Sequence, residues 1–152
     1  MRDFLFSIVF LLTLSNNFVF SQNISQTEFS NLIKKSPEYV KKYLILKDWK
    51  LKNESKDEVK LCYSNSNYFL DSNVTLNINN NSLISLKLEI ENTGVFDKYK
   101  LISSRNKNFR KIKEDDNETH FVSIDNNYSL IFYTKKFGQK EKKIVVISKI
   151  HN

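Results

Sequence analysis

The chain has 152 residues, a pI near 9.4 and a formal net charge of +7, which suits either plain solubility or an anionic partner such as lipid headgroups, cell-wall polymers or extracellular nucleic acid. Its single cysteine, Cys62, excludes an intramolecular disulfide, so stability must come from an apolar core. Only two glycines and one proline occur, which argues against long flexible linkers.

The N-terminal segment has the pattern of a secretory signal peptide. A short charged start is followed by an apolar run from Phe4 to Leu14, and small side chains precede a cleavage position at Ser21. The run is shorter than the roughly 20 apolar residues that cross a bilayer. We therefore predict a signal peptide over residues 1–21, cleavage after Ser21, and export to the periplasm or outside the cell; an uncleaved anchor is the alternative.

Two helix starts are expected at the beginning of the remaining domain, residues 22–152. Ser25-Gln26-Thr27-Glu28 has the form of a capping box, and Ser36-Pro37 places an N-cap serine before a proline suited to a first helical turn. Apolar residues recur on one helical face after both starts. We predict two short helices or one kinked helix over 25–46, with Trp49 anchoring the junction between helix and sheet.

After residue 47 the apolar period changes to two, which indicates strands with one buried and one solvated face. The alternating segments are 59–63, 74–78, 84–90, 119–124, 128–133 and 144–150. Turns are expected at 79–81, 125–127 and 137–139, two of them rich in asparagine. Residues 95–102 favour a helix, with a strand as the alternative. These elements predict an α+β fold in which an N-terminal helix pair packs on a mainly antiparallel sheet.

The sequence also contains a faint internal repeat. At a constant offset of sixty residues, Trp49-Lys50, Glu54 and Glu58 to Leu61 align with Phe109-Arg110, Glu114 and Glu118 to Phe121. A helix-plus-sheet unit used twice, over 25–92 and 93–152, would explain the match. The order of elements is similar to that of tandem helix-plus-sheet inhibitor domains of the β-lactamase-inhibitor type, although no motif carries the likeness and we assign no family.

The residues of common catalytic and cofactor sites are scarce. Two histidines, one cysteine and two widely separated glycines form no triad, zinc motif or phosphate-binding loop. His120, beside the acidic run from Glu114 to Glu118, is the one starting point for a hydrolase. Cys62 is interpreted as a space-filling side chain, with a thiol that links to a partner as the alternative. We predict no catalytic, metal or cofactor site.

Lysines gather around the turn at 137–139 and form a candidate basic patch. Its members are Lys135, Lys136, Lys140, Lys142 and Lys143, with Tyr133 and Phe137 interleaved. Nucleic-acid grooves combine cations and stacking rings in this way, whereas lysines at strand ends also prevent edge-to-edge aggregation. We favour the protective role, because no specific nucleic-acid motif is present.

These observations favour a small exported, non-enzymatic binding protein that uses exposed sheet faces and aromatic-rich loops. Its expected partner is another envelope protein, or a secreted effector that it inhibits. The alternative is a cationic protein that binds an anionic polymer or a membrane surface. A hydrolase based on His120 is the third hypothesis.

Overall fold

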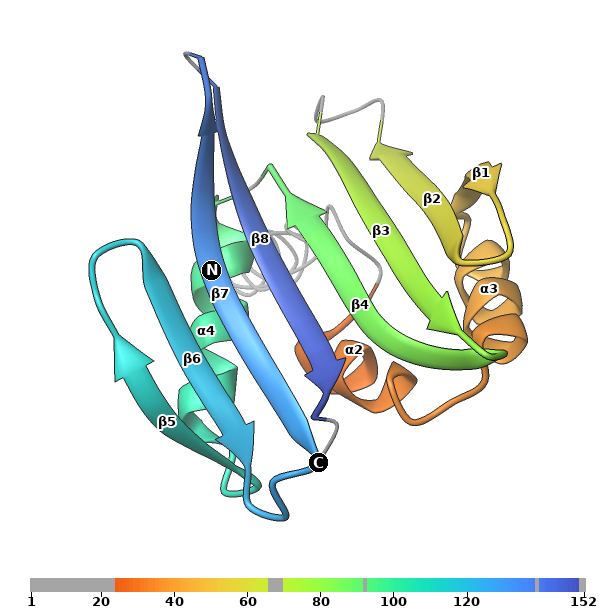
Figure 1. Ribbon diagram of the computed structural model, residues 1–152. Helices are drawn as coiled ribbons and strands as arrows, with labels where there is room; N and C mark the ends of the chain where they lie inside the picture. Colours follow the sequence, from red (N-terminus) through yellow and green to blue (C-terminus); the bar gives the residue numbers. More distant parts are fainter. Residues whose placement is uncertain (1–23, 66–69, 92, 139, 151–152) are drawn as a thin grey trace, which may run out of the picture.

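The computed structural model describes residues 24–65, 70–91, 93–138 and 140–150. The expected leader and the cleavage after Ser21 lie outside these residues. The described part is a mixed α+β fold, mostly antiparallel sheet, as the sequence predicts (Figure 1). Among its helices, none has the length and apolar character needed to cross a membrane.

The elements follow the chain as helices, a first set of strands, a helix and a second set of strands. The helices are α2 (Gln26–Leu32), α3 (Pro37–Leu46) and α4 (Thr93–Arg105). The first strands are β1 (Lys50–Glu54), β2 (Glu58–Asn65), β3 (Leu70–Asn79) and β4 (Ser82–Ile90). The second strands are β5 (Phe109–Glu114), β6 (Glu118–Ser123), β7 (Tyr128–Phe137) and β8 (Lys140–Lys149).

Local sequence signals set the helix starts. The predicted capping box is confirmed, since the Ser25 hydroxyl accepts the Glu28 amide at 3.2 Å and the Glu28 carboxylate accepts the Ser25 amide at 2.7 Å. Ser36 caps α3, with Pro37 in its first turn, so this region forms two helices. The preferred helix over 95–102 is also confirmed and is part of α4.

All eight strands form one antiparallel sheet in the order β1-β2-β3-β4-β8-β7-β6-β5. Each set of four strands is a meander, and the two meanders meet where β4 pairs with β8 (Figure 1). Asparagine supplies the expected turn chemistry: Asn80 and Asn81 between β3 and β4, and Asn126 between β6 and β7, have positive φ. Gly138 does the same between β7 and β8, with φ of 61°.

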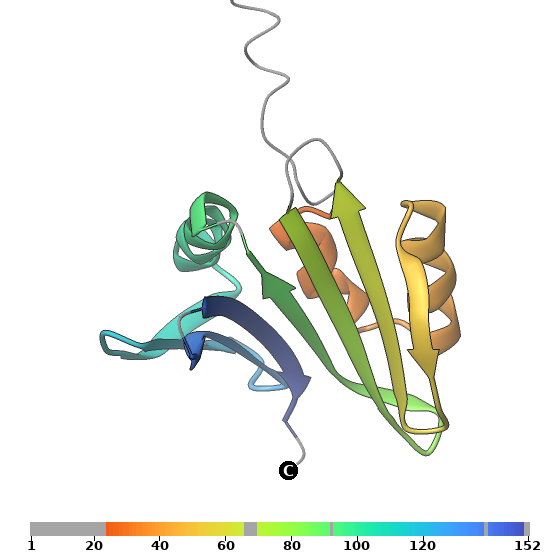
Figure 2. The same cartoon turned by 90° about the horizontal axis from the view of Figure 1, so that it is seen from above.

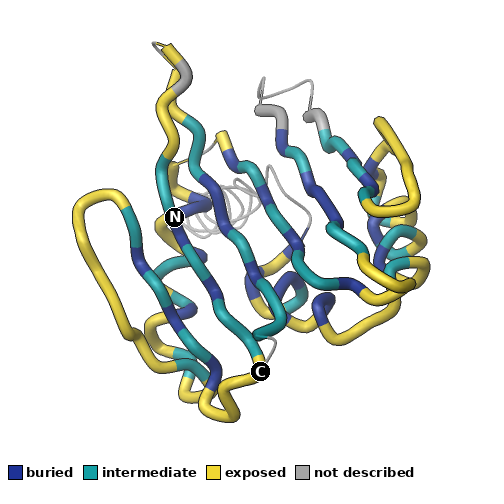
Figure 3. Tube along the Cα trace, viewed as in Figure 1, coloured by how far each residue is buried: buried dark blue, intermediate teal, exposed yellow. Residues whose placement is uncertain are grey.

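The three helices of the described chain lie on one face of the sheet, and no helix of the described residues lies over the opposite face (Figures 1 and 2). One hydrophobic core lies between the layers and includes residues of all three helices, among them Phe29, Leu44 and Phe96. Along the central strands, buried residues alternate with partly exposed ones, because successive side chains point to opposite faces (Figure 3).

Trp49 joins the helical layer to the sheet at the first half of the fold. It is 1% exposed, and its ring centroid lies 5.5 Å from that of Tyr63. Its amide donates to the carbonyl of Leu44 at 3.0 Å, so the end of α3 leads directly into β1. The expected burial of Trp49 at this junction is confirmed.

Buried hydrogen bonds connect α2 to α4. The Tyr99 hydroxyl donates to the carbonyl of Ile24, and Gln26 Nε2 donates to the hydroxyls of Ser30 and Ser103, both at 2.9 Å. Burial, and to a smaller extent the charge of Glu28, raises the pKa of the Tyr99 hydroxyl, which therefore stays a donor. These contacts bind α2 to α4 within the helical layer.

Candidate functional site

The candidate site is the helix-free side of the sheet, which we call the open face. Its residues alternate along each strand with those that point into the core. Val59, Leu61 and Tyr63 pack in or against the core, so Cys62 lies on the open face, as the sequence predicts. Cys62 is a half-buried free thiol.

The half of the open face that belongs to β2, β3 and β4 is polar. Asn77 donates from Nδ2 to the Ser85 hydroxyl of the neighbouring strand at 2.7 Å. Glu58 and Lys60 form an ion pair of 2.8 Å along β2. Water solvates such polar side chains well. This half therefore has the composition that is usual for the solvent-exposed face of an antiparallel sheet.

The half that belongs to β6, β7 and β8 carries five apolar or aromatic side chains, which we call the apolar strip: Val122, Ile131, Tyr133, Ile144 and Val146. Cross-strand pairing sets Ile131 beside Val146 and Tyr133 beside Ile144. Ile144 is only 2% exposed yet does not belong to the core between sheet and helices. Its neighbours on the open face therefore bury it, and the strip is a second, one-sided apolar cluster.

Ion pairs border the apolar strip on both sides. On the β4 side, Glu89 lies 2.9 Å from Lys142 and 3.1 Å from Lys87. Partial burial raises the pKa of Glu89, but hydrogen bonds from Lys142 and Lys87 outweigh it and hold the pKa below its usual value. On the β6 side, Glu118 lies 3.2 Å from Lys113. The acidic groups of the border are thus neutralised within the protein.

His120 lies in this border, beside Glu118 of the acidic run. Its Nε2 is 2.7 Å from a Glu118 oxygen, without the direction of a hydrogen bond, so we treat the contact as an ion pair that forms when the imidazole is protonated. Cys62 is on β2, five strand spacings away, or roughly 24 Å at about 4.8 Å per strand. The thiol and the imidazole cannot act as a pair, and no group of three or more metal-ligating side chains occurs among the described residues.

The five lysines of the candidate basic patch lie on one hairpin, the outer part of β7 and β8, but do not share a face. Lys135 is opposite Lys142 on the open face, where Lys142 contacts Glu89. Lys143 lies on the helix side, with its ammonium 5.9 Å from the Phe96 ring centroid. Lys136 is opposite Glu141, and Lys140 begins β8. Strand alternation therefore divides the set between two faces.

The apolar strip was not recognised in the sequence, although a signal for it exists. Residues 130–133 and 144–147 are apolar at every position, whereas 86–90 alternates apolar and charged residues. An uninterrupted apolar run predicts a strand with both faces covered. In the described structure, helices cover only one face of these strands.

Comparison of the sequence with models of protein families and with curated proteins found no match, and comparison of the fold with solved structures found none. A function must therefore be inferred from the geometry of the chain itself.

Proposed function

We propose that this chain is an exported, non-enzymatic binding protein and that its open face holds another protein. One observation carries the proposal: an apolar strip lies on a sheet face that no described helix covers. Clustered apolar side chains with a polar border are typical of interfaces, and four of the five here are partly exposed while Ile144 is buried. Export rests on the signal-peptide pattern of residues 1–21.

The size of the open face fits a standard protein interface. Eight strands at about 4.8 Å spacing span roughly 34 Å, and strands of five to ten residues extend about 17–33 Å. A stable interface of standard size needs about 800 Å² on each partner. The apolar strip would form the apolar core of the interface, and the polar half and the ion pairs that border the strip would form its rim.

Charge indicates the chemistry of the partner. The sequence has 24 lysines and arginines against 17 acidic residues, and Lys87, Lys113 and Lys142 stand around the strip. We therefore propose a folded envelope or secreted protein that presents an apolar centre with an acidic rim. Opposite charges at the rim speed association and select the partner more than they add affinity.

Tyr133 is the anchor we propose within the strip. Its ring is half-buried between Glu118 on β6 and Ile144 on β8, and its hydroxyl makes no hydrogen bond to another described residue. Tyrosine is enriched among the residues that dominate binding energy, because it buries a large ring at little cost in side-chain entropy. A partner acceptor could take the hydroxyl proton.

We infer further that the fold repeats one unit of helix and four strands. Both outer hairpins have the same irregular register, with a shift between Leu51 and Asn53 in β1 and between Lys111 and Lys113 in β5, sixty residues on. The turns of the two outer hairpins also match. The Ser55 amide donates to the Glu58 carbonyl at 2.8 Å, and sixty residues on the Asp115 amide donates to the Glu118 carbonyl at 2.9 Å.

Two more features support the repeat. An ion pair between the helix and the outer strand occurs in each half, Lys41 with Glu54 at 2.7 Å and Lys100 with Glu114 at 3.1 Å. In the middle of the sheet, Leu86 pairs with Ile147 and Leu88 with Val145. An offset of fifty-nine exchanges these two pairs, which is the relation expected of two units placed about a local two-fold axis.

Site-specific photo-crosslinking tests the proposed binding face. A photoreactive residue replaces Ile131 in the full-length chain, expressed in the organism that makes it, and a matched chain carries it at Leu101, exposed on α4. We expect one protein adduct at position 131 and none at 101. Tyr133→Ala should reduce the adduct, whereas Asn77→Ala on the polar half should not.

Three outcomes would overturn the proposal. The first is no protein adduct at position 131, or the same adducts at both positions. The second is an adduct that consists only of a second copy of the chain. The third is an association that falls steeply between about 50 and 200 mM salt, which indicates contact with an anionic polymer.

A further inference from the structure

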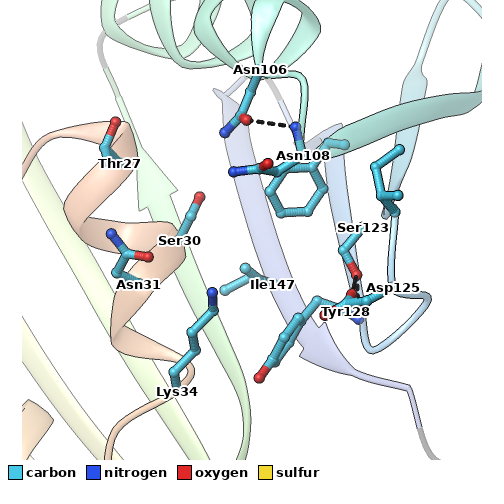
Figure 4. Close-up of a pocket in the computed structure, with 12 residues that line it drawn as sticks. Thr27, Ser30, Asn31, Lys34, Asn106, Asn108, Ser123, Asp125, Tyr128 and Ile147 are labelled. Atoms are coloured by element: carbon cyan, nitrogen blue, oxygen red, sulfur yellow. Dashed lines mark hydrogen bonds between the residues drawn. The ribbon is translucent and has the colours of Figure 1, made fainter.

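A pocket of about 370 Å³ opens on the helix side of the second half, away from the open face (Figure 4). One wall is the α2 side, with Thr27, Asn31 and Lys34. The other wall comes from the turn between α4 and β5 and the turn between β6 and β7. Ile147 of β8, which is fully buried, closes the floor. The volume lies at the lower end of the usual range for small-molecule sites, about 300–1,000 Å³.

Hydrogen bonds hold the two turns in place. Asn106 Oδ1 accepts the amide of Asn108 at 2.9 Å, which fixes the turn after α4 (Figure 4). The carbonyl of Asn108 accepts the amide of Ile124 at 2.9 Å and so ties this turn to the next one. Asp125 Oδ1 accepts the Ser123 hydroxyl at 2.5 Å. The wall is therefore formed before any ligand arrives, which lowers the entropic cost of binding.

Several polar groups of the pocket have capacity left for a ligand. The side-chain amides of Asn31 and Asn108 are exposed and make no hydrogen bond to a described residue. Ser30 is 8% exposed, and its oxygen accepts from Gln26 Nε2, itself on a residue 2% exposed. The Ser30 hydroxyl can thus donate its own proton into the pocket.

The charges in the pocket balance. Lys34 holds its ammonium 5.6 Å from the ring centroid of Tyr128. Hydrogen bonds from the Ser123 hydroxyl and from Asn127, together with the charge of Lys34, keep the pKa of Asp125 below its usual value, so this carboxylate is ionised at neutral pH. One cation and one anion leave no net charge for an ionic ligand to neutralise.

We propose that this pocket binds a neutral saccharide of one or two rings. Each sugar hydroxyl both donates and accepts a hydrogen bond, and the Asn31 and Asn108 amides offer both functions in return. The face of a sugar ring is lined by C–H groups, which can pack on the Phe109 ring that lines the pocket. This site is separate from the proposed protein-binding face.

Titration of the isotope-labelled chain with sugars, followed by NMR, tests the pocket. The probes are glucose, galactose, mannose, N-acetylglucosamine and its β-1,4-linked dimer, with glycerol as a non-cyclic control. We expect at least one sugar to cause saturable shifts confined to the amides of the pocket turns and α2. Asn108→Ala should weaken that sugar at least tenfold, because it removes a bidentate amide, whereas Asn53→Ala on exposed β1 should leave its affinity unchanged.

The following results would overturn the proposal. No sugar gives a saturable shift, or the shifts spread over the open face as well. Glycerol produces the same shifts as the sugars, or Asn108→Ala binds as tightly as the unmodified chain. Since Asn108 is exposed and its backbone bonds remain, an unchanged amide spectrum elsewhere shows that the variant is folded.

Discussion

The two halves of the sheet have the same strand pairing and present different surfaces. In β4, Leu86 and Leu88 face the core while Lys87 and Glu89 face solvent. In β8, Val145 and Ile147 face the core, and Ile144 and Val146 on the other side are also apolar. Backbone pairing alone therefore does not determine surface chemistry. In one sheet, equivalent strands can present a polar surface that water solvates, as β4 does, or an apolar surface that is stabilised by a binding partner, as β8 does.

The helix side shows a matching difference. At the first half, Trp49 fills the junction between helix and outer strand. At the second half, its counterpart Phe109 is half-buried and lines the pocket between α2 and the turns. The apolar strip thus belongs to the second half, and the pocket combines the turns of the second half with α2 of the first. Apart from α2, the first half has a mainly stabilising role, and this division can be tested.

The largest expected effect is a difference in the free energy of unfolding between variants of Trp49 and variants of its counterpart Phe109. Trp49→Ala should lower the free energy of unfolding by about 3–5 kcal/mol, since it empties a fully buried site. Phe109→Ala should cost clearly less, because its ring already contacts the pocket. Urea unfolding of both variants measures the difference. Equal losses would mean that the halves do not differ in packing.

The next effect concerns affinity and is confined to the second half. Tyr133→Ala should weaken binding of the proposed partner by about 2 kcal/mol, or roughly 30-fold. Lys87→Ala, at the edge of the polar half, should change affinity by less than about threefold at physiological salt. A binding assay on the captured partner distinguishes them. A larger effect at Lys87 would place the binding centre on the polar half.

Removal of one hydroxyl tests how tightly the halves are coupled through the helical layer. Tyr99→Phe leaves the carbonyl of Ile24 without its donor in a buried place, and should destabilise the fold by about 1–2 kcal/mol. Tyr39→Phe, on an exposed ring of α3, is the matched control and should be neutral. Thermal unfolding checks both, and a neutral Tyr99→Phe would contradict the proposed coupling.

The smallest effect depends on pH. Partial burial raises the pKa of Glu28, but hydrogen bonds from Lys47, Tyr43 and Ser25 together lower it to about 2. A depressed carboxyl pKa stabilises the fold above its ordinary value of 4.5, and this contribution is lost as pH falls from 4.5 to about 2.

Glu28→Gln should therefore be less stable than the unmodified chain at pH 7, by less than about 1 kcal/mol because the carboxylate is partly solvated. The two proteins should approach equal stability as pH falls to about 2 and below. Urea midpoints at pH 7, 4 and 2 measure this convergence. Glu114→Gln, in the second half, is the matched comparison on an exposed carboxylate. A difference that persists at pH 2 would assign the effect of Glu28→Gln to packing.

Sequence patterns predicted what is local. The capping box at Ser25, the asparagine turn after β3 and the helix containing Tyr99 all depend on residues a few positions apart, and all are present. The pairing of β4 with β8 joins segments far apart in the chain, and no local signal specifies it. The pocket depends on that pairing and on α2, so its lining residues could not be grouped from the sequence.

The candidate basic patch illustrates a different limit. Proximity in sequence places Lys142 and Lys143 together, yet period-two geometry sends one toward Glu89 and the other toward the Phe96 ring. The apolar strip shows the converse. Its five residues come from three strands, and the uninterrupted apolar runs in β7 and β8 indicate only four of them, since Val122 is on β6.

The pairing of β4 with β8 also limits how early the sheet can be completed during synthesis. β4 ends at Ile90 and β8 begins at Lys140, so β4 has its outer edge unpaired until the segment of β8 has been synthesised. Non-local pairing of this kind is slow, and an unpaired edge can recruit the same edge of another chain. Translation products that stop before Ile144 would therefore be the species most prone to aggregate. Chaperone binding would matter most before β8 has been synthesised.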